Sequence, residues 1–590
     1  MILVTTRDDR VANVLSSKNP HLTVSLMNEE ESWELFRNQV FYSTMCPLEL
    51  EGIGRSIAES CNGLPLLIKT TAGIVAKRER SVEAWEEIKK LLPYWSIAED
   101  DDGKKMMEML KLSYDDLSEK MKPCFLYLAV FPQYDDIRVR DLIELWIAEG
   151  FIEPIQTGRS NALEPEDIGE EYLKELVDRN LVQVVSRRSD GKGVKTCQIH
   201  NLIRDLCISV SNNPDNNSNA RKLSFPRDDG AHVCSVTSNQ SRTCSLFVYG
   251  YVEEWPHHIP KDCQVNVLDF KGLNTDEGKN AEYLKGLQSL KFLRMIFSEL
   301  KRLCMLQSLQ TLHIVYNTSK YNMNIERLKH LRHLHSDFEV KLLGASEDKM
   351  QNVQTLCYVL LDSKLESFLK NGYFPNLRTL GLQINGHRQL KGMEFSLQLL
   401  TKLRKLKLYL AFKTLTLGKI VFPSTLTKIT LSGYDGLKSE DMNALGQIPS
   451  LQILKLGGVS CIEEILNCGT QRSFLLLQVF IMVRVSSVTC LTLEDGAMRC
   501  LRRAIFRHCP GLELKNLPKQ MRSLGYNLEF EQLIPPLNNL ELSREEEISD
   551  EEEEISEEEF LEAEEESEQE YSEEEYLSEE EDDDDDDDDD

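Results

Sequence analysis

Residues 400–408 have the sequence Leu-Thr-Lys-Leu-Arg-Lys-Leu-Lys-Leu, with leucine at the first, fourth, seventh and ninth positions. The same spacing of apolar residues recurs at 306–314, 374–382 and 448–456. Alignment on the third apolar position gives successive matches 19 to 26 residues apart, at Leu268, Leu293, Leu312, Leu334, Leu356, Leu380, Leu406, Ile429, Leu454 and Phe480. Repeats of about 20–29 residues with this pattern each supply one short strand, and these strands stack into a curved parallel sheet. We therefore expect a leucine-rich-repeat solenoid over residues 216–540.

The part of the chain before the repeats is predicted to be mainly helical. Asn28, followed by three glutamates, is typical of a helix start, because a side-chain acceptor and acidic residues suit that end of a helix. Gly63 suits a positive backbone φ, and Pro65 suits the first turn of the next helix. These signals predict a helical module at 28–110. Residues 1–27 contain an apolar, β-branched stretch, 2–6, of the kind found in a buried strand.

Residues 111–215 predict helices followed by two short strands around the turn at 189–192, and then a helix near His200. Helices with a strand hairpin of this kind favour a winged-helix module. Such modules often bind DNA, but this one is rich in acidic side chains and offers no basic face. We therefore expect no direct binding to nucleic acid. The acidic residues concerned are Asp135, Asp136, Asp141, Glu144 and Glu149.

The acidic character of the chain comes from its end. Residues 545–590 hold 32 of the 98 acidic side chains and no Lys or Arg, which leaves 66 acids against 68 bases elsewhere. We expect a disordered tail over 541–590, because like charges repel and bury little surface. The 15 cysteines show no zinc-binding spacing, and the start of the chain has no secretory pattern. The sequence contains no apolar stretch of the ~20 residues needed to span a membrane. These features favour a cytoplasmic protein, with the nucleus or the inner face of the plasma membrane as other locations.

Several short motifs, in their order along the chain, resemble one family. They are Thr5-Thr6-Arg7, then residues 61–66 (Cys-Asn-Gly-Leu-Pro-Leu), then 124–132 and 145–150, and finally Ile199-His200-Asn201. In this order, and ahead of the repeats, they resemble the plant NB-ARC leucine-rich-repeat disease-resistance proteins. The resemblance is to the coiled-coil class, including late-blight resistance homologues, and it covers about residues 1–540. It implies a multidomain α+β fold in which residues 1–27 are the end of a nucleotide-binding α/β domain.

The resemblance implies that ADP and ATP are the ligands of a molecular switch. In this chain Arg7 would approach the phosphates and His200 would bind the β-phosphate. Gly63, Leu64 and Pro65 would belong to the nucleotide-binding motif whose proline packs on the adenine. The family's Gly-x-x-x-x-Gly-Lys-Ser/Thr loop is absent from these 590 residues. Since that loop supplies the N–H groups and the lysine that hold phosphate, we expect the switch to be impaired in an N-terminally truncated receptor. Asn201 also replaces the family's aspartate.

Each of these residues also has a plain structural explanation. Arg7 could be a solvated arginine at a strand end, Pro65 a helix-start proline, and His200 a helix cap. The nearby histidines His330, His333 and His335 are expected to lie on the surface of the solenoid rather than to hold a metal.

The resemblance implies a non-enzymatic immune receptor whose repeats bind a pathogen effector or a guarded host protein. An alternative is a repeat protein whose acidic tail binds basic partners such as histones. A third hypothesis, a weak nucleotide hydrolase, is opposed by the absent phosphate loop.

Overall fold

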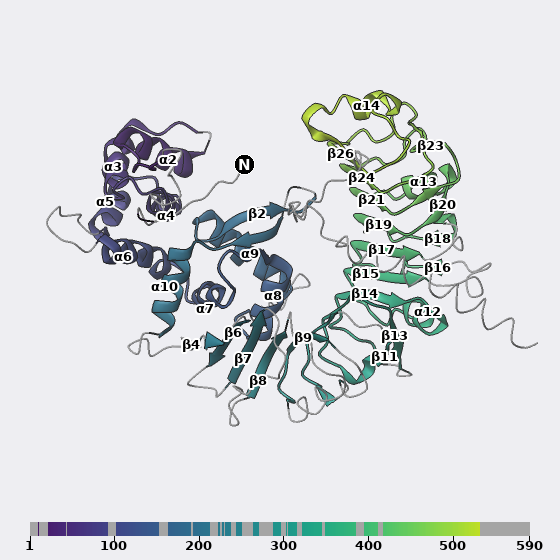
Figure 1. Ribbon diagram of the computed structural model, residues 1–590, viewed down its shortest axis with the longest axis horizontal. Coiled ribbons are helices and arrows are strands. Elements are labelled where there is room, and N and C mark those ends of the chain that lie inside the picture. Colours follow the sequence, from purple (N-terminus) through teal and green to yellow (C-terminus); the bar gives the residue numbers. More distant parts are fainter. Residues whose placement is uncertain are drawn as a thin grey trace, which may run out of the picture. The chain divides into compact units, whose positions relative to one another are not determined.

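The computed structural model divides the chain into two compact units (Figure 1). The first comprises residues 1–129, 167–183 and 198–210, and the second comprises 130–166, 184–197 and 211–590. The strand expected at 2–6, Arg7 and the acidic tail lie outside the described residues. The structure describes residues 10, 22–42, 44–92, 102–152, 163–189, 191, 193–212, 222–224, 227–228, 231–237, 243–249, 264–270, 287–296, 303, 305–315, 321–344, 348–384, 395–410 and 417–531.

The first unit is built mainly from helices, as expected. Asn28 caps the first of them, because its side chain accepts a hydrogen bond from the Glu31 N–H while the Glu31 carboxylate accepts one from the Asn28 N–H. The core contains Trp33, Phe36 and Trp85, all almost fully buried. The helices are α2 (Glu29–Phe41), α3 (Leu48–Glu59), α4 (Pro65–Val75), α5 (Val82–Leu91), α6 (Asp102–Asp115), α7 (Lys122–Tyr127), α9 (Pro165–Asp178) and α10 (Asn201–Asn212).

Close backbone approach holds this unit together at Gly73. A Cβ atom built on Gly73 in α4 would lie 2.7 Å from the Cα of Arg179, which follows α9. The same arginine donates to Asp116 at 2.5 Å and to Glu175 at 2.8 Å. The absence of a side chain at Gly73 therefore lets α4 meet the end of α9 at backbone distance.

The second unit begins with the remainder of the expected winged-helix module. It contains the strand β1 (Ile137–Arg138), the helix α8 (Val139–Ala148), and the strands β2 (Gln183–Arg187) and β3 (Val194–Gln198). The three strands form one sheet in the order β1-β3-β2, with β1 antiparallel to β3. The two strands predicted around the turn at 189–192 are thus present.

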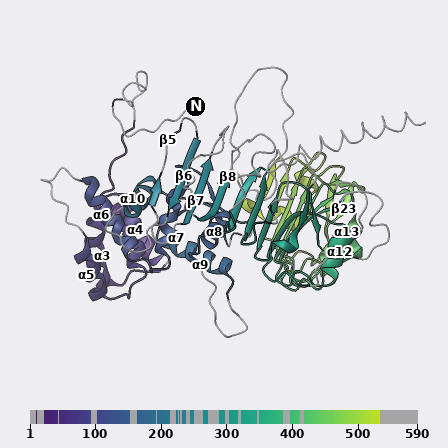
Figure 2. The same cartoon turned by 90° about the horizontal axis from the view of Figure 1, so that it is seen from below.

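The rest of the second unit is a solenoid of parallel strands (Figures 1 and 2). Its first strands are antiparallel, namely β4 (Lys222–Ser224), β5 (Arg227–Asp228), β6 (Ala231–Thr237) and β7 (Thr243–Tyr249). From β7 onward each principal strand is parallel to the next. These strands are β8 (Gln264–Phe270), β9 (Phe292–Ile296), β10 (Thr311–Val315), β12 (His333–Ser336), β14 (Thr355–Leu360), β15 (Thr379–Ile384), β17 (Lys405–Leu410), β19 (Lys428–Ser432), β21 (Ile453–Gly457), β24 (Val479–Val483), β26 (Arg503–Arg507) and β27 (Leu528–Glu531).

The register of these strands confirms the repeat alignment made from the sequence. Every residue aligned there faces the next one across neighbouring strands, from Leu268 to Phe480, and the structure adds Leu246 before them and Ala504 and Leu528 after them. All of these side chains except that of Leu528, which packs at the margin, lie in one continuous apolar core. The predicted multidomain α+β fold class with a repeat solenoid is therefore confirmed.

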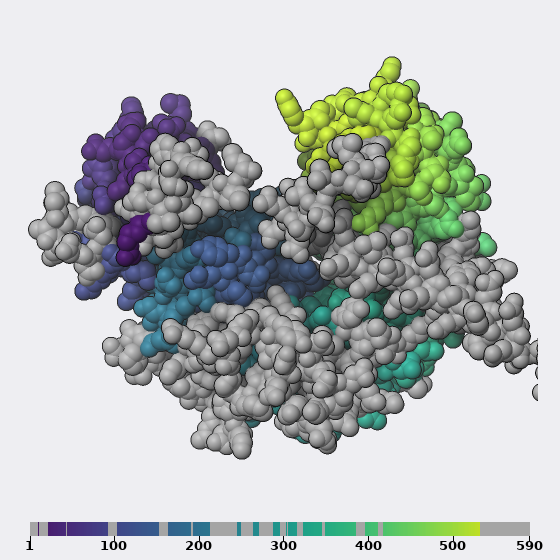
Figure 3. Space-filling view, in the orientation of Figure 1, coloured from purple at the N-terminus to yellow at the C-terminus, as the bar shows by residue number. Residues whose placement is uncertain are grey.

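The side of the solenoid away from the principal parallel strands carries helices and short strands. Among them are α12 (Ser363–Lys370) and α13 (Ser439–Gly446), which lie on the outer side of the sheet in Figure 1. Parallel pairs of minor strands accompany them: β11 (Tyr321–Asn324) with β13 (Val340–Leu343), β16 (Phe395–Ser396) with β18 (Ile420–Val421), β20 (Asp435–Leu437) with β22 (Ser460–Cys461), and β23 (Ile465–Asn467) with β25 (Cys490–Thr492). In the space-filling view the last repeats, green to yellow, form one continuous surface (Figure 3). No helix among the described residues is long and apolar enough to cross a membrane.

Candidate functional site

The residues expected to belong to the nucleotide-binding motif lie between α3 and α4 in the first unit. Gly63 has a φ of +66°, as predicted, and its carbonyl accepts a hydrogen bond of 3.0 Å from the Met27 N–H. A Cβ at Gly63 would lie 2.3 Å from the Met27 carbonyl oxygen, so only glycine fits there. Leu64 is the N-cap of α4, and Pro65 is its first residue and is exposed. This geometry leaves one edge of Pro65 available to an aromatic base.

His200 lies in the same compact unit, immediately before α10. Its Nδ1 accepts a hydrogen bond of 3.2 Å from the Leu202 N–H, which is the capping arrangement that the sequence offered as the plain explanation. In a neutral imidazole the proton then resides on Nε2. His200 is half-buried. His200 therefore caps α10 through Nδ1, and its role toward a phosphate stays a prediction.

A second group of polar side chains lies entirely within the second unit, on helix α8. One side of this helix and its C-terminal end carry three acidic residues that are almost fully buried. They are Asp141, Glu144 and Glu149, whose exposed fractions are 5%, 2% and 4%. Buried carboxylates are costly unless they are paired. The sequence indicated these residues only as a reason why the module has no basic face, and their burial was not predicted. Their carboxylates face the first strands of the solenoid.

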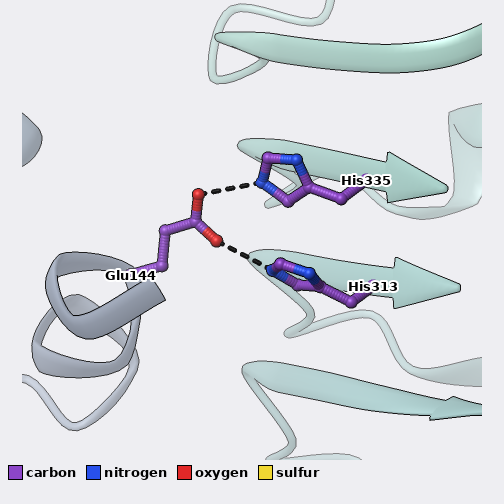
Figure 4. A group of neighbouring side chains, drawn as sticks. All are labelled: Glu144, His313 and His335. Carbon is purple, nitrogen blue, oxygen red and sulfur yellow. Dashed lines mark hydrogen bonds and ion pairs between the residues drawn. The ribbon is translucent and has the colours of Figure 1, made fainter. Parts of the chain in front are cut away.

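Glu144 contacts two histidines on neighbouring strands (Figure 4). Its Oε2 lies 3.1 Å from His313 Nε2 on β10, and its Oε1 lies 2.9 Å from His335 Nε2 on β12. The two histidines face each other in the parallel register, with ring centroids 4.3 Å apart. One carboxylate thus joins α8 to two adjacent repeats.

Burial lowers the pKa of both histidines well below the usual value. The positive charge of Arg294 lowers the pKa of His313 further, and that of Arg140 lowers the pKa of His335. Both imidazoles are therefore neutral at pH 7. A neutral imidazole can either donate a hydrogen bond from Nε2 to the carboxylate or present a lone pair there, depending on its tautomer.

Asp141 and Glu149 extend the contact toward the start of the solenoid. Arg294 on β9 donates to Asp141 at 2.7 Å and forms an ion pair with Asp269 on β8 at 3.5 Å. The Ser245 hydroxyl on β7 donates to Glu149 at 2.6 Å. The α8 side chains therefore contact residues from β7, β9, β10 and β12.

A related contact is made by Glu166, in the first turn of α9. Arg332 donates two hydrogen bonds to its carboxylate, at 2.7 and 2.8 Å, and His333 Nε2 lies 3.0 Å away. Gln354, immediately before β14, donates a further hydrogen bond of 3.0 Å. Burial alone would raise the pKa of Glu166, but the hydrogen bonds of His333 and Arg332 hold it well below the usual range.

The expected surface position of two histidines is therefore wrong. His333 and His335 are 5% and 6% exposed, whereas His330 is exposed as predicted. The signal that could have revealed the site is a single column across the sheet. Each residue that directly follows an aligned leucine on β8, β9, β10 and β12 belongs to it, namely Asp269, Arg294, His313 and His335.

Two known families match parts of the chain. The disease resistance protein winged helix domain matches residues 130–207, which include α8 and β3. The NB-ARC domain, a nucleotide-binding domain, matches residues 1–46, which include Arg7. Both matches agree with the motif order on which the resemblance was based.

Whole-chain comparisons find plant relatives. The chain is 39% identical over 207 residues to a putative late blight resistance protein homolog of Solanum demissum, which is 35% of this chain and 15% of that protein. It is 28% identical over 569 residues to disease resistance protein RPP13 of Arabidopsis thaliana, which is 92% of this chain and 61% of that protein.

Among solved structures, a leucine-rich-repeat protein of Leptospira interrogans matches 47% of this chain and 80% of its own, with 15% identity and a TM-score of 0.22. The chain spans less than two thirds of the length of these plant relatives, and 28% in the case of the ToMV susceptible protein tm-2 of Solanum lycopersicum. The two domain matches and the named plant relatives make the chain similar to the plant NB-ARC leucine-rich-repeat disease-resistance proteins.

Proposed function

We propose that the chain acts in plant defence as part of an intracellular immune receptor that works by binding rather than by catalysis. The observation that carries this proposal is that residues 130–166 and 184–197, which are part of the segment matching the resistance-protein winged helix, share one compact unit with the repeats, and that α8 is hydrogen-bonded to the solenoid there. A protein bound to the repeats would therefore act on the module that, in this family, belongs to the nucleotide switch. The proposed domains are residues 1–27, 28–110, 111–215, 216–540 and 541–590, and the proposed location is the cytoplasm.

The partner is proposed to be a protein, either a pathogen effector or a guarded host protein. Beyond α8 the same face of the sheet carries Lys407 on β17 and Lys455 on β21, in the column that holds His313 and His335. Next to them lies a small apolar cluster on the same face, made of Ile453, Val479, Ile481 and Ile505. Lys455 and the four apolar side chains are only 4–7% exposed, whereas Lys407 is half-buried, so an acidic group of a protein partner would meet Lys407 on this face. The relatives named above give the histone-binding alternative no support.

The test is pairwise binding between the purified chain and individual effectors, or the host proteins that those effectors modify. We expect one such protein to bind, and the variant Lys407→Glu to weaken its binding at least about tenfold, or 1.4 kcal/mol. The matched control is Lys364→Glu on α12, on the outer side of the solenoid. If no candidate binds, or if the control weakens binding equally, the proposal is wrong.

The nucleotide is proposed to be ADP or ATP, bound by the residues named from the family resemblance, Arg7, Gly63, Leu64, Pro65 and His200. Because the 590 residues hold no phosphate-binding loop, we expect this chain alone to bind ADP weakly. Calorimetric titration with ADP measures this directly. A Kd below about 1 μM, corresponding to about −8 kcal/mol, would contradict the expectation.

A further inference from the structure

Three potential metal ligands converge where α8 meets the solenoid. The Glu144 carboxylate and the ring nitrogens of His313 and His335 all lie within 4.8 Å of one another (Figure 4). All three side chains are buried, and each comes from a different element, α8, β10 or β12. The parallel pairing of β10 with β12 fixes the two histidines side by side. The positions of all three donors are thus set by regular secondary structure.

The donor set suits a particular class of ion. Two imidazole nitrogens and one carboxylate oxygen are ligands that zinc accepts, with a fourth position left for water. Zinc binds such donors at about 2.0–2.2 Å, so ligand atoms in a tetrahedral site lie about 3.4 Å apart. The Glu144 oxygens now lie 3.1 and 2.9 Å from the two nitrogens. All three ligand atoms already lie within 4.8 Å of one another, so an ion would draw them together from that separation to about 3.4 Å.

The surroundings allow a cation although Arg140, which pairs with Asp141 at 3.4 Å, lies beside His335 and although Arg294 lies beside His313. The positive charge of that side chain is already paired with Asp141 at 2.7 Å and Asp269 at 3.5 Å. Metal binding requires that each Nε2 presents its lone pair to the ion, so the proton of each imidazole then occupies Nδ1. Metal affinity commonly depends on neutral imidazole in this way.

We propose that Glu144, His313 and His335 form a binding site for a divalent transition-metal ion of the zinc class. The bound ion would connect α8 to the strands β10 and β12. The bound ion takes the place of the two hydrogen bonds that now join these side chains. It links the winged-helix segment to the solenoid by coordination bonds. This site goes beyond the proposed function and does not depend on it.

The experiment titrates the full chain with Zn²⁺ alone, in competition with a chelator of known zinc affinity. Millimolar Mg²⁺ is included, because the 32 acidic side chains of residues 545–590 offer oxygen ligands that hard cations prefer. We expect one Zn²⁺ per chain with a Kd of about 1 μM or tighter, and a rise in the melting temperature of the second unit. Co²⁺ in place of Zn²⁺ should give the visible absorption of a low-coordinate site with nitrogen ligands.

The variants are His313→Gln and His335→Gln, since a glutamine amide can still donate to Glu144 but is a poor metal ligand. Loss of a residue that merely orients a ligand costs 10–100-fold in affinity, so loss of a ligand itself should cost at least about 100-fold. His330→Gln, at an exposed histidine near β12, is the matched control and should bind as the parent chain does.

Two outcomes would overturn the proposal. One is a chain that binds no Zn²⁺ in the presence of Mg²⁺, and the other is binding that survives both His313→Gln and His335→Gln. If the variants fail to fold, X-ray absorption of the zinc-loaded parent chain decides. Two imidazole ligands support the site, and oxygen ligands alone refute it.

Discussion

Two arginines in this chain each join two carboxylates, yet in different surroundings. Arg55 in the first unit pairs with Glu30 at 2.8 Å and Glu51 at 3.0 Å, and its side chain is 37% exposed. Arg294 in the second unit pairs with Asp141 and Asp269, and its side chain is 7% exposed. The contacts have the same chemistry and similar lengths. They differ in whether water can replace a lost partner.

The difference in exposure between Arg55 and Arg294 indicates how sensitive each contact is to the loss of a partner. Water and salt screen an exposed ion pair, so it contributes little to stability. A buried pair does not stabilise strongly by itself, but its removal leaves an uncompensated charge away from water. The charged groups of α8 and the first repeats are therefore sensitive positions, whereas those around Arg55 are not. The first unit also has a largely buried pair, between Arg179 and Asp116, so the contrast concerns the two arginines and not the two units as wholes.

The largest effect is expected from Arg294→Ala. This change leaves Asp141 and Asp269 buried without their shared cation, and breaking a buried pair costs about 3–5 kcal/mol. Hydrogen exchange of peptides from β8 to β12, followed by mass spectrometry, measures the loss of stability locally. A change below about 1 kcal/mol would show that water reaches this contact and that the comparison with Arg55 fails.

Acidification is expected to weaken the same contact. The pKa of His313 and of His335 in the folded chain lies below the ordinary value of 6.5, so the unfolded chain binds protons first as the pH falls. Stability is therefore fully present above about pH 6.5 and falls below it, by at most about 1.4 kcal/mol per pH unit for each histidine. The depressed pKa of Glu166 adds a loss only below about pH 4.5, as the pH falls toward its folded value.

Chemical denaturation at several pH values, with a chelator present, checks this. The double variant His313→Gln with His335→Gln should have a flatter profile between pH 6.5 and 5, since glutamine does not titrate. Equal slopes for the variant and the parent chain would assign the pH dependence to other groups.

In the first unit we expect the steric change Gly73→Ala to destabilise by about 1–3 kcal/mol, because the added methyl group meets the Arg179 backbone. Gly52→Ala in α3 is the matched control. A Cβ there meets nothing within 4 Å, and alanine in a helix is favoured over glycine by up to about 1 kcal/mol. Tryptophan fluorescence of Trp33 and Trp85 reports the unfolding of this unit. If both variants melt alike, close packing at Gly73 is not what holds α4 to α9.

The smallest effect is expected from Arg55→Ala. Glu30 and Glu51 are exposed, so water solvates them when the arginine is removed. The melting temperature of the first unit should stay nearly unchanged, and 0.5 M NaCl should remove any remaining difference. A loss comparable to that of Arg294→Ala would contradict the contrast between the two arginines.

The repeat fold could be predicted from the sequence almost residue by residue. Inward-facing leucines recur because each repeat must bury the same position, so the period alone identified the strand register from Leu268 to Phe480. The turn at Gly63 and the helix starts at Asn28 and Pro65 were also predictable, since each depends on local backbone chemistry. The roles of Arg7, Gly63, Leu64, Pro65 and His200 toward a nucleotide stay predictions.

The contact of α8 with the solenoid was not predictable in the same way. Glu144 lies 169 residues before His313 and 191 before His335, and no periodic signal connects them. A row of acidic residues on a helix is usually solvated, and a histidine after a strand leucine is usually exposed. Only the three-dimensional structure shows that the acidic side chains of α8 and the strand histidines bury one another.

The place of α8 on β7 to β12 has a consequence for receptor engineering. Repeats are often regarded as interchangeable modules, but here Ser245, Asp269, Arg294, His313 and His335 are matched to one particular helix. A chimera that joins foreign repeats before β14 would leave the acidic side chains of α8 facing unsuitable neighbours. The portion that can be grafted between relatives therefore begins at β14, and the earlier strands should be inherited together with the helix.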